Sequence, residues 1–201
     1  MKRQTMKMAG ALIALAVGFA AASVLAREPG ATSSEKSGSN AWHGLVTEAE
    51  TTAAAFREAD PSLSRFFSES VGYAVFPSIG KGAVGIGGAY GRGVLFERGE
   101  ATGRSTLTQV TVGPQLGGEA YSEVVFFETH ESLARFKRGE YTMAAQVSAV
   151  IAASGASANA RYAQGVAAFT LPRGGLMAEV SVGGQRFAFT PAARVIAERA
   201  E

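Results

Sequence analysis

The feature that most constrains this chain is a glycine-rich stretch over residues 80–96, which reads GKGAVGIGGAYGRGVLF. Successive side chains of a β-strand point to opposite faces, so every second residue shares a face. One face of such a strand would be almost bare, because it consists of Gly85, Gly87, Ala89, Gly91 and Gly93. Glycine weakens a strand through its entropy and its missing side chain. The stretch therefore needs compensation from a sharp bend, a closely packed neighbour, or a ligand against bare backbone.

A straight strand over residues 84–96 would span roughly 40 Å at ~3.3 Å per residue, which is long for a domain of this size. We therefore expect the strand to bend within a curved antiparallel sheet. The chain has 201 residues and a hydrophobic fraction of 47%, which is enough for one domain with its own core.

The first 26 residues have the layout of a secretory signal peptide. Basic residues at positions 2, 3 and 7 precede an uncharged apolar run over residues 8–22, and Val24-Leu25-Ala26 offers a cleavage site. We expect cleavage near Ala26 and a periplasmic or secreted protein. The alternative is an uncleaved anchor, because residues 8–26 almost reach the length that spans a membrane.

Removing this segment changes the charge balance. Without its three cations, 16 basic residues remain against 17 acidic ones, a formal charge of −1. Nucleic-acid binding then loses its main electrostatic support, and so does non-specific adhesion to anionic membranes. The chain has no cysteine, which excludes disulfides, thiolate catalysis, cysteine-type zinc sites and a lipid-modified N-terminal cysteine. We expect no cofactor and no metal ion.

Residues 27–40 are polar and rich in glycine and serine, and they predict a flexible tether before a single domain over 41–201. Apolar residues at three- and four-residue spacing predict a helix over 42–58, and a short helix over 62–70 follows. The period then changes to that of strands. The predicted strands are 73–76 (ending at Pro77), the glycine-rich strand, 106–112, 115–121 and 123–128, with a polar turn over 97–105, a break at Gly113-Pro114 and a solvated turn at Ser122.

The remainder of the chain returns to helix at its end. Thr129 is a helix cap and Gly139 a helix stop, so a helix is predicted between them. Composition leaves residues 142–154 open between helix and strand. The further predicted elements are strands over 163–171 and 176–182 separated by 172–175, a turn at Gly183-Gly184 into 186–189, and a last helix from Thr190-Pro191. The predicted fold class is α+β, with a curved antiparallel or barrel-like sheet, N-terminal helices, one inserted helix and a C-terminal helix.

Two stretches match the residue pattern of a nucleotide-binding or a serine–lysine motif, but their predicted secondary structure does not fit. Gly80-x-Gly82-x-x-Gly85 fits the dinucleotide fingerprint, but that motif must open a helix, and the residues after it alternate as a strand. Ser78-x-x-Lys81 fits the serine–lysine pattern, but the nucleophile there begins a helix, whereas Ser78 follows a proline in a turn. Neither motif predicts a site.

The supply of catalytic residues is small. The chain has two histidines, a single aspartate and no GxSxG elbow, so a Ser-His-Asp triad has almost nothing to draw on. Glu119 and Glu123 could form a carboxylate pair, but Ser122 between predicted strands favours a solvated turn. We predict that the chain is not an enzyme.

Three blocks of sequence resemble the lipid-binding SYLF domain: GYAVFPSIGKGAVGIGGAYGRGVLF, TVGPQLGGEAYSEVVFF and RGGLMAEVSVGG. Their order and spacing match from about Gly72 to Phe189, with a helix carrying Leu133 and Phe136 between the last two. The resemblance implies a domain core over 72–189 and strand rather than helix over 142–154. It also implies lipid binding, since eukaryotic members bind phosphoinositides, some bind actin filaments, and secreted bacterial members are thought to bind phospholipid.

The chain departs from the eukaryotic pattern in its acidic helix 42–58, because lipid contacts there are attributed to a basic N-terminal segment. We therefore expect a non-catalytic phospholipid-binding protein of the bacterial envelope, whose partner is phospholipid or a membrane surface rather than nucleic acid or actin. The candidate lipid-binding residues are Lys81 and Arg92 near a headgroup, with Tyr90 at the boundary. The alternative is a structural or protein-interaction module of the envelope in which these cations are simply solvated.

Overall fold

The computed structural model describes residues 33–140, 142–144, 149–150, 157–179 and 182–197. Contacts divide the chain into residues 1–30 and 31–201, and all of the described residues belong to the second unit. The predicted signal peptide and its cleavage near Ala26 lie outside the described residues and stay predictions. No helix in the described ranges is both long and apolar enough to cross a membrane.

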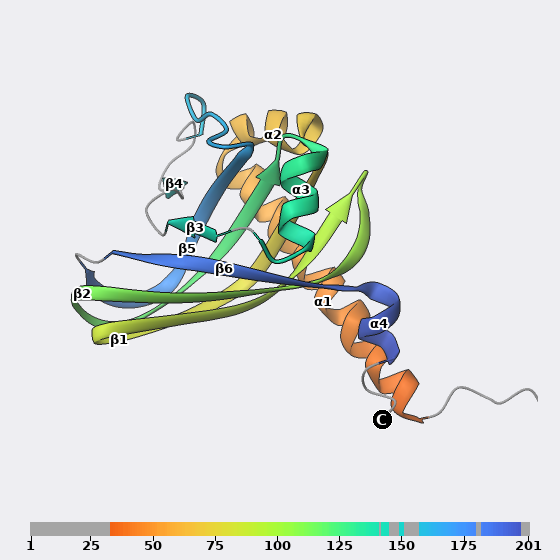
Figure 1. Ribbon diagram of the computed structural model, residues 1–201, viewed down its shortest axis with the longest axis horizontal. Coiled ribbons are helices and arrows are strands. Elements are labelled where there is room, and N and C mark those ends of the chain that lie inside the picture. Colours follow the sequence, from red (N-terminus) through yellow and green to blue (C-terminus); the bar gives the residue numbers. More distant parts are fainter. Residues whose placement is uncertain (1–32, 141, 145–148, 151–156, 180–181, 198–201) are drawn as a thin grey trace, which may run out of the picture. The chain divides into compact units, whose positions relative to one another are not determined.

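Helices flank and interrupt a run of strands (Figure 1). The elements are α1 (Ser33–Ala59), η1 (Pro61–Leu63), α2 (Ser64–Glu69), β1 (Gly72–Glu97), β2 (Glu100–Phe127), α3 (His130–Lys137), β3 (Thr142–Ala144), β4 (Ala149–Val150), β5 (Val166–Glu179), β6 (Val182–Pro191) and α4 (Ala192–Ala197). The strands form one sheet, antiparallel except where β4 pairs with β5. The predicted α+β class is confirmed, and over the described strands the sheet does not close into a barrel.

Strand β2 is the centre of the sheet. β1 pairs with one edge of β2 from end to end. The other edge is divided, because residues 103–112 pair with β6 and residues 115–127 pair with β5. The β6 half-sheet consists of β6, residues 103–112 of β2 and residues 86–95 of β1, which pair with them. The β5 half-sheet consists of β5, residues 115–127 of β2 and residues 72–84 of β1.

A bend separates the two half-sheets. The pairing of β1 with β2 shifts between Val84 and Ile86, and Gly85 between them has φ +73°. Opposite this shift on β2 are Pro114 and Gly113, the latter with φ +151°. Glycine adopts such positive φ values without steric cost. The expected bend is confirmed, and the predicted break at Gly113-Pro114 is wrong, because the strand turns there and continues.

Two further prolines lie inside strands rather than at their ends. The register of β1 against β2 shifts around Pro77, between Phe76 and Ile79. The register of β2 against β5 shifts beside Pro172. Proline lacks the N–H that a regular ladder needs, but it is tolerated where a bulge interrupts the pairing. The strand boundaries predicted at these prolines are therefore wrong, and β5 runs through Pro172.

The turns are shorter than predicted. β1 and β2 are joined at Arg98 and Gly99, which both have positive φ (52° and 83°), so most of the turn predicted over 97–105 is strand. Such two-residue turns match the twist of antiparallel strands. Ser122 was predicted in a solvated turn, but it is 3% exposed within β2. The turn predicted at Gly183-Gly184 is also wrong, because both residues belong to β6.

Helix ends follow their local signals more closely. Thr129 and Ser132 form a capping box at the start of α3, and Gly139 follows its end with φ +70°. α1 begins at Ser33, so the later part of the predicted tether is helical. Within 142–154, the described residues are strand, as the family resemblance implies.

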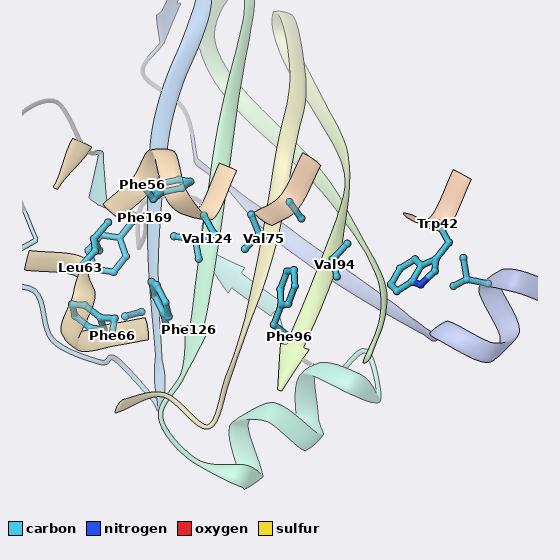
Figure 2. Packing of buried hydrophobic residues seen from close by; sticks show 14 residues of the cluster. Trp42, Phe56, Leu63, Phe66, Val75, Val94, Phe96, Val124, Phe126 and Phe169 are labelled. Carbon is cyan, nitrogen blue, oxygen red and sulfur yellow. The ribbon is translucent and has the colours of Figure 1, made fainter. Parts of the chain in front are cut away.

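Two clusters of buried apolar side chains lie on opposite faces of the sheet. The first lies under α1, η1 and α2, where the ring of Phe66 is 4.9 Å from that of Phe169 and 5.5 Å from that of Phe126 (Figure 2). The second lies on the inner face of the bent sheet, where Phe136 of α3 covers it. Because both faces are covered at this end, residues 124–127 can be apolar without alternation.

The bare face of the glycine-rich strand is covered by the first half of the same strand. A Cβ atom on Gly91 would lie 2.6 Å from Cγ1 of Ile79, and one on Gly93 would overlap the carbonyl oxygen of Val75. A Cβ atom on Gly87 would lie 2.5 Å from a side chain of the partner strand. These distances are too short for any real side chain. The absence of side chains thus allows the two parts of β1 to meet, and the bare face is buried from Gly87 to Gly93, whereas Gly85 at the bend is exposed.

Replacing Gly93 by alanine tests this packing. The added methyl group must displace the backbone of Val75 or the ring of Phe76, so we expect the free energy of unfolding to fall by ~1–3 kcal/mol. Gly88→Ala is the matched control, because Gly88 is exposed on the same strand and its new Cβ would be 3.8 Å from the nearest atom. Thermal unfolding followed by circular dichroism compares the two. Equal losses would show that the close approach is absent.

Candidate functional site

The outer face of the bent hairpin carries large aliphatic side chains in contact with water. From Gly80 to Arg92 of β1, even-numbered residues share this face, and so do the even-numbered residues of β2 with which they pair, such as Val112 opposite Ile86. Their exposed fractions are 69% and 55%. Val84 and Leu116, 80% and 65% exposed, pair with each other and continue the row across the bend. We call this set the apolar ridge, made of Val84, Ile86, Val110, Val112 and Leu116.

The ridge is unusual because its members are contiguous. Single exposed aliphatic side chains are ordinary, whereas a contiguous patch marks a surface that meets another molecule. The surface beside the ridge is bare: on the outer face of the β5 half-sheet, Gly82 pairs with Gly118 and Gly80 with Ala120. A Cβ atom on Gly80 or Gly82 would meet nothing within 4 Å. The ridge therefore stands beside open backbone.

Polar character rises along the same face, away from the ridge. Tyr90 is 55% exposed and pairs with Thr108, which pairs on its other edge with the exposed Arg186. Arg92 is also exposed, two residues beyond Tyr90. At ~3.3 Å per residue, Arg92 lies about 20 Å from Ile86 along the strand. One face thus passes from aliphatic through aromatic to cationic groups.

Arg92 also lines two shallow hollows between α1 and β1. One, of about 230 Å³, is lined in addition by Trp42 and Arg104. The other includes Tyr90. Glu48 of α1 lines both hollows. Each hollow therefore offers a cation and an anion together, which suits a polar or zwitterionic group better than an apolar chain.

Lys81 lies on the other face of β1. It shares the inner face with the buried Ile79, and its side chain is only 7% exposed. Its Nζ atom is 3.6 Å from Oε1 of Glu119. The structure therefore brings together two of the three predicted lipid-binding residues, Tyr90 and Arg92, and separates Lys81 from them. Whether any of the three contacts lipid stays a prediction.

A polar cluster that sequence reasoning missed lies on the inner face. Gln185 of β6 donates from Nε2 to Oε2 of Glu123 at 3.0 Å and to Oε1 of Gln109 at 3.2 Å. The hydroxyl of Tyr121 donates to the same oxygen of Gln109 at 3.3 Å. Glu123 and Gln185 are 0% and 2% exposed. We call these four residues the inner polar cluster.

The predicted solvated position of Glu123 is wrong. β2 continues through Ser122, so alternation carries Glu123 to the inner face together with Val125. Burial raises the pKa of Glu123 to about 8 from its ordinary 4.5, although the hydrogen bond from Gln185 acts in the opposite direction. The sequence did hold a signal, because Glu123 directly precedes the apolar run 124–127.

The chemistry available on the outer face is that of contact rather than reaction. It presents aliphatic, phenolic and guanidinium groups, which make apolar contacts and hydrogen bonds. Among the described residues, no group of three or more histidine, aspartate or glutamate side chains comes together to hold a metal ion.

Comparison with known proteins finds a family match over part of the chain. The family described as "Ysc84: Las17-binding protein actin regulator" matches residues 108–193, which span most of β2 together with β5 and β6. The Ysc84 family is defined by the SYLF domain. Residues 108–193, somewhat less than half of the chain, therefore match the SYLF family. The resemblance predicted from the sequence is thereby confirmed.

The chain is also similar to "Beta cell expansion factor A" from Aeromonas veronii. The two are 25% identical over 155 residues, which cover 76% of this chain and 58% of the relative. The match thus spans little more than half the length of that relative. The SYLF family is consistent with a lipid-binding or interaction module.

The raised pKa of Glu123 predicts a pH-dependent stability. Between pH 4.5 and about 8, the folded chain keeps a proton on Glu123 that the unfolded chain releases. The free energy of unfolding should therefore fall as pH rises through this window, by about 1.4 kcal/mol per pH unit from this group, and its contribution should level off above pH 8. Glu123→Gln carries no charge and should lack this contribution. Urea unfolding between pH 5 and 9 measures both proteins, and parallel pH profiles would contradict the prediction.

Proposed function

We propose that this SYLF domain binds phospholipid membrane surfaces of the bacterial envelope without catalysing a reaction. The observation that carries the proposal is the exposed apolar ridge, with Tyr90 and Arg186, and then Arg92, farther along the same face. A membrane presents hydrocarbon, then an interface that favours aromatic rings, then phosphate groups. The outer face presents complementary groups in the same order.

The aliphatic groups would supply most of the binding free energy. Each CH₂ group moved from water into hydrocarbon contributes about 0.8 kcal/mol. A basic side chain near an anionic surface contributes about 1 kcal/mol. Because the chain without its first 26 residues has a formal charge of −1, attraction depends on the local arginines rather than on net charge. Added salt should therefore weaken binding only in part.

The proposal assigns different roles to the predicted residues. Tyr90 and Arg92 remain lipid contacts, and the ridge and Arg186 join them. Lys81 is left to its ion pair with Glu119 inside the bent sheet. The predicted signal peptide over residues 1–26 supports an envelope location, where phospholipid is the abundant ligand.

Sedimentation with phosphatidylglycerol vesicles tests the ridge. The double variant Ile86→Ser/Val112→Ser removes two exposed aliphatic side chains, so we expect binding to weaken by about tenfold to a hundredfold. Its free energy of unfolding should stay within ~0.5 kcal/mol for each exposed substitution. Gly82→Ser is the control, because it adds a hydroxyl group to the same face and removes no aliphatic group. If the double variant sediments with the vesicles as well as the wild-type protein does, the ridge does not bind the membrane.

The arginines are tested separately by their salt dependence. Arg92→Ala and Arg186→Ala should each weaken vesicle binding about fivefold at low salt and much less at high salt. Arg98→Ala is the matched control, since Arg98 is also exposed but lies in the turn that follows β1. If the three variants lose the same affinity, the arginines beside the ridge have no special role.

A second candidate is a protein partner at the same face. The family description as a Las17-binding actin regulator supports this candidate, although the expected export argues against actin itself. Wild-type protein that stays in solution with vesicles, and that carries no lipid by mass spectrometry, would favour the protein partner over the membrane.

A further inference from the structure

We propose that Glu123 and Gln185 form a protonation switch that holds the two half-sheets together. The two residues belong to different half-sheets, because Glu123 lies on β2 beside β5 and Gln185 lies on β6. Their hydrogen bond of 3.0 Å therefore crosses the space inside the bend. Tyr121 and Gln109 cross the same space, also with one partner on each side. The inner polar cluster is thus a buried polar link between the half-sheets, in addition to the hydrogen bond from Thr111 to Gln115 at the bend.

Two oxygen atoms in this link accept no hydrogen bond from the described residues. They are Oε1 of Glu123 and Oε1 of Gln185, and both are buried. A protonated carboxyl and a primary amide are complementary, because each offers one donor and one acceptor to the other. The amide already donates from Nε2 to Oε2 of Glu123. A proton on Oε1 of Glu123 would supply the donor that Oε1 of Gln185 lacks.

The surroundings favour the neutral form of Glu123. On β2, the side chains beside it are those of Tyr121 and Val125, and Phe76 is its partner on β1. β6 contributes Gln185 and the buried Phe187. None of these groups is positively charged. Burial is accordingly the main cause of the raised pKa of Glu123.

The charged side chains nearest to Glu123 among the described residues bond to groups other than Glu123. Lys81 and Glu119 pair with each other farther along the inner face, about 13 Å from Glu123 at ~3.3 Å per residue. Arg173 of β5 donates to the carbonyl of Pro77, which also accepts from Ser122. The side chain of Ser122 points to the face of β2 opposite Glu123. Within the described part of the chain, an ionised Glu123 would therefore have one amide donor and no cation.

Ionisation should open the bend. A buried carboxylate without a charged partner is strongly unfavourable, and separation of the half-sheets lets water reach it. With Glu123 neutral, its hydrogen bonding with Gln185 holds the half-sheets together. With Glu123 ionised, the half-sheets separate. The device responds to pH across the range in which Glu123 titrates, and it needs no ligand.

Cysteine accessibility tests the switch. The chain has no cysteine, and Ser105 is a suitable probe because it is fully buried on the inner face and its hydroxyl has no partner among the described residues. The alkylation rate of Ser105→Cys is compared between otherwise wild-type protein and the Glu123→Gln background at each pH, so that thiol ionisation cancels. We expect the alkylation rate in otherwise wild-type protein, divided by the rate in the Glu123→Gln background, to rise at least about thirtyfold between pH 6 and 9. The reason is that opening releases a proton from Glu123, so higher pH favours the open form.

Glu119→Gln is the matched control. It removes a carboxylate from the same strand face, but one whose side chain is 36% exposed and paired with Lys81, so the pH-dependent rise should persist. A constant ratio would overturn the proposal. If Ser105→Cys disturbs folding, the carbon-13 titration of the Glu123 carboxyl in the unsubstituted full chain decides instead. A midpoint near 8 supports the switch, and a midpoint near 4.5 overturns it.

Discussion

The close approach of the two parts of β1 is the constraint on which the other features depend. Gly91 and Gly93 have no side chains, so Val75 and Ile79 of the same strand can lie directly against them. This contact, together with the turn at Gly85, folds one half-sheet over the other. Glycine is costly within a strand, and burial of the inner apolar cluster offsets that cost.

The contrast between the two faces follows from this folding. Thr111 points inward and donates to Gln115 at 2.8 Å, whereas its neighbours Val110 and Val112 point outward into water. Near the bend, polar side chains thus fill the inside and aliphatic ones occupy the outside, the reverse of an ordinary β-sheet surface. This inversion gives the domain both its proposed membrane-binding ridge and a buried carboxyl.

Local patterns predicted a good part of this arrangement. Alternation in residues 80–96 indicated the bare face and the bend, and Thr129 and Gly139 marked the ends of α3. Strand lengths were not predictable, because a proline such as Pro77 ends a strand or only bends it according to the register of a distant partner. Arg186 was missed for the same reason, since pairing through Thr108 is what brings it beside Tyr90. The position of Lys81 was predictable, because alternation along the strand places this odd-numbered residue on the face opposite Tyr90 and Arg92.

The folding of β1 onto itself is tested most directly by a proton–proton contact measured by nuclear magnetic resonance in the isotope-labelled chain. The ring of Phe76 lies against Gly93, seventeen residues further along the same strand, where it would meet an added Cβ at 2.7 Å. We predict a strong nuclear Overhauser effect between the Phe76 ring protons and the Hα protons of Gly93. If Phe76 and Gly93 each show nuclear Overhauser effects to the neighbouring strand but none to each other, β1 is extended and this folding is contradicted.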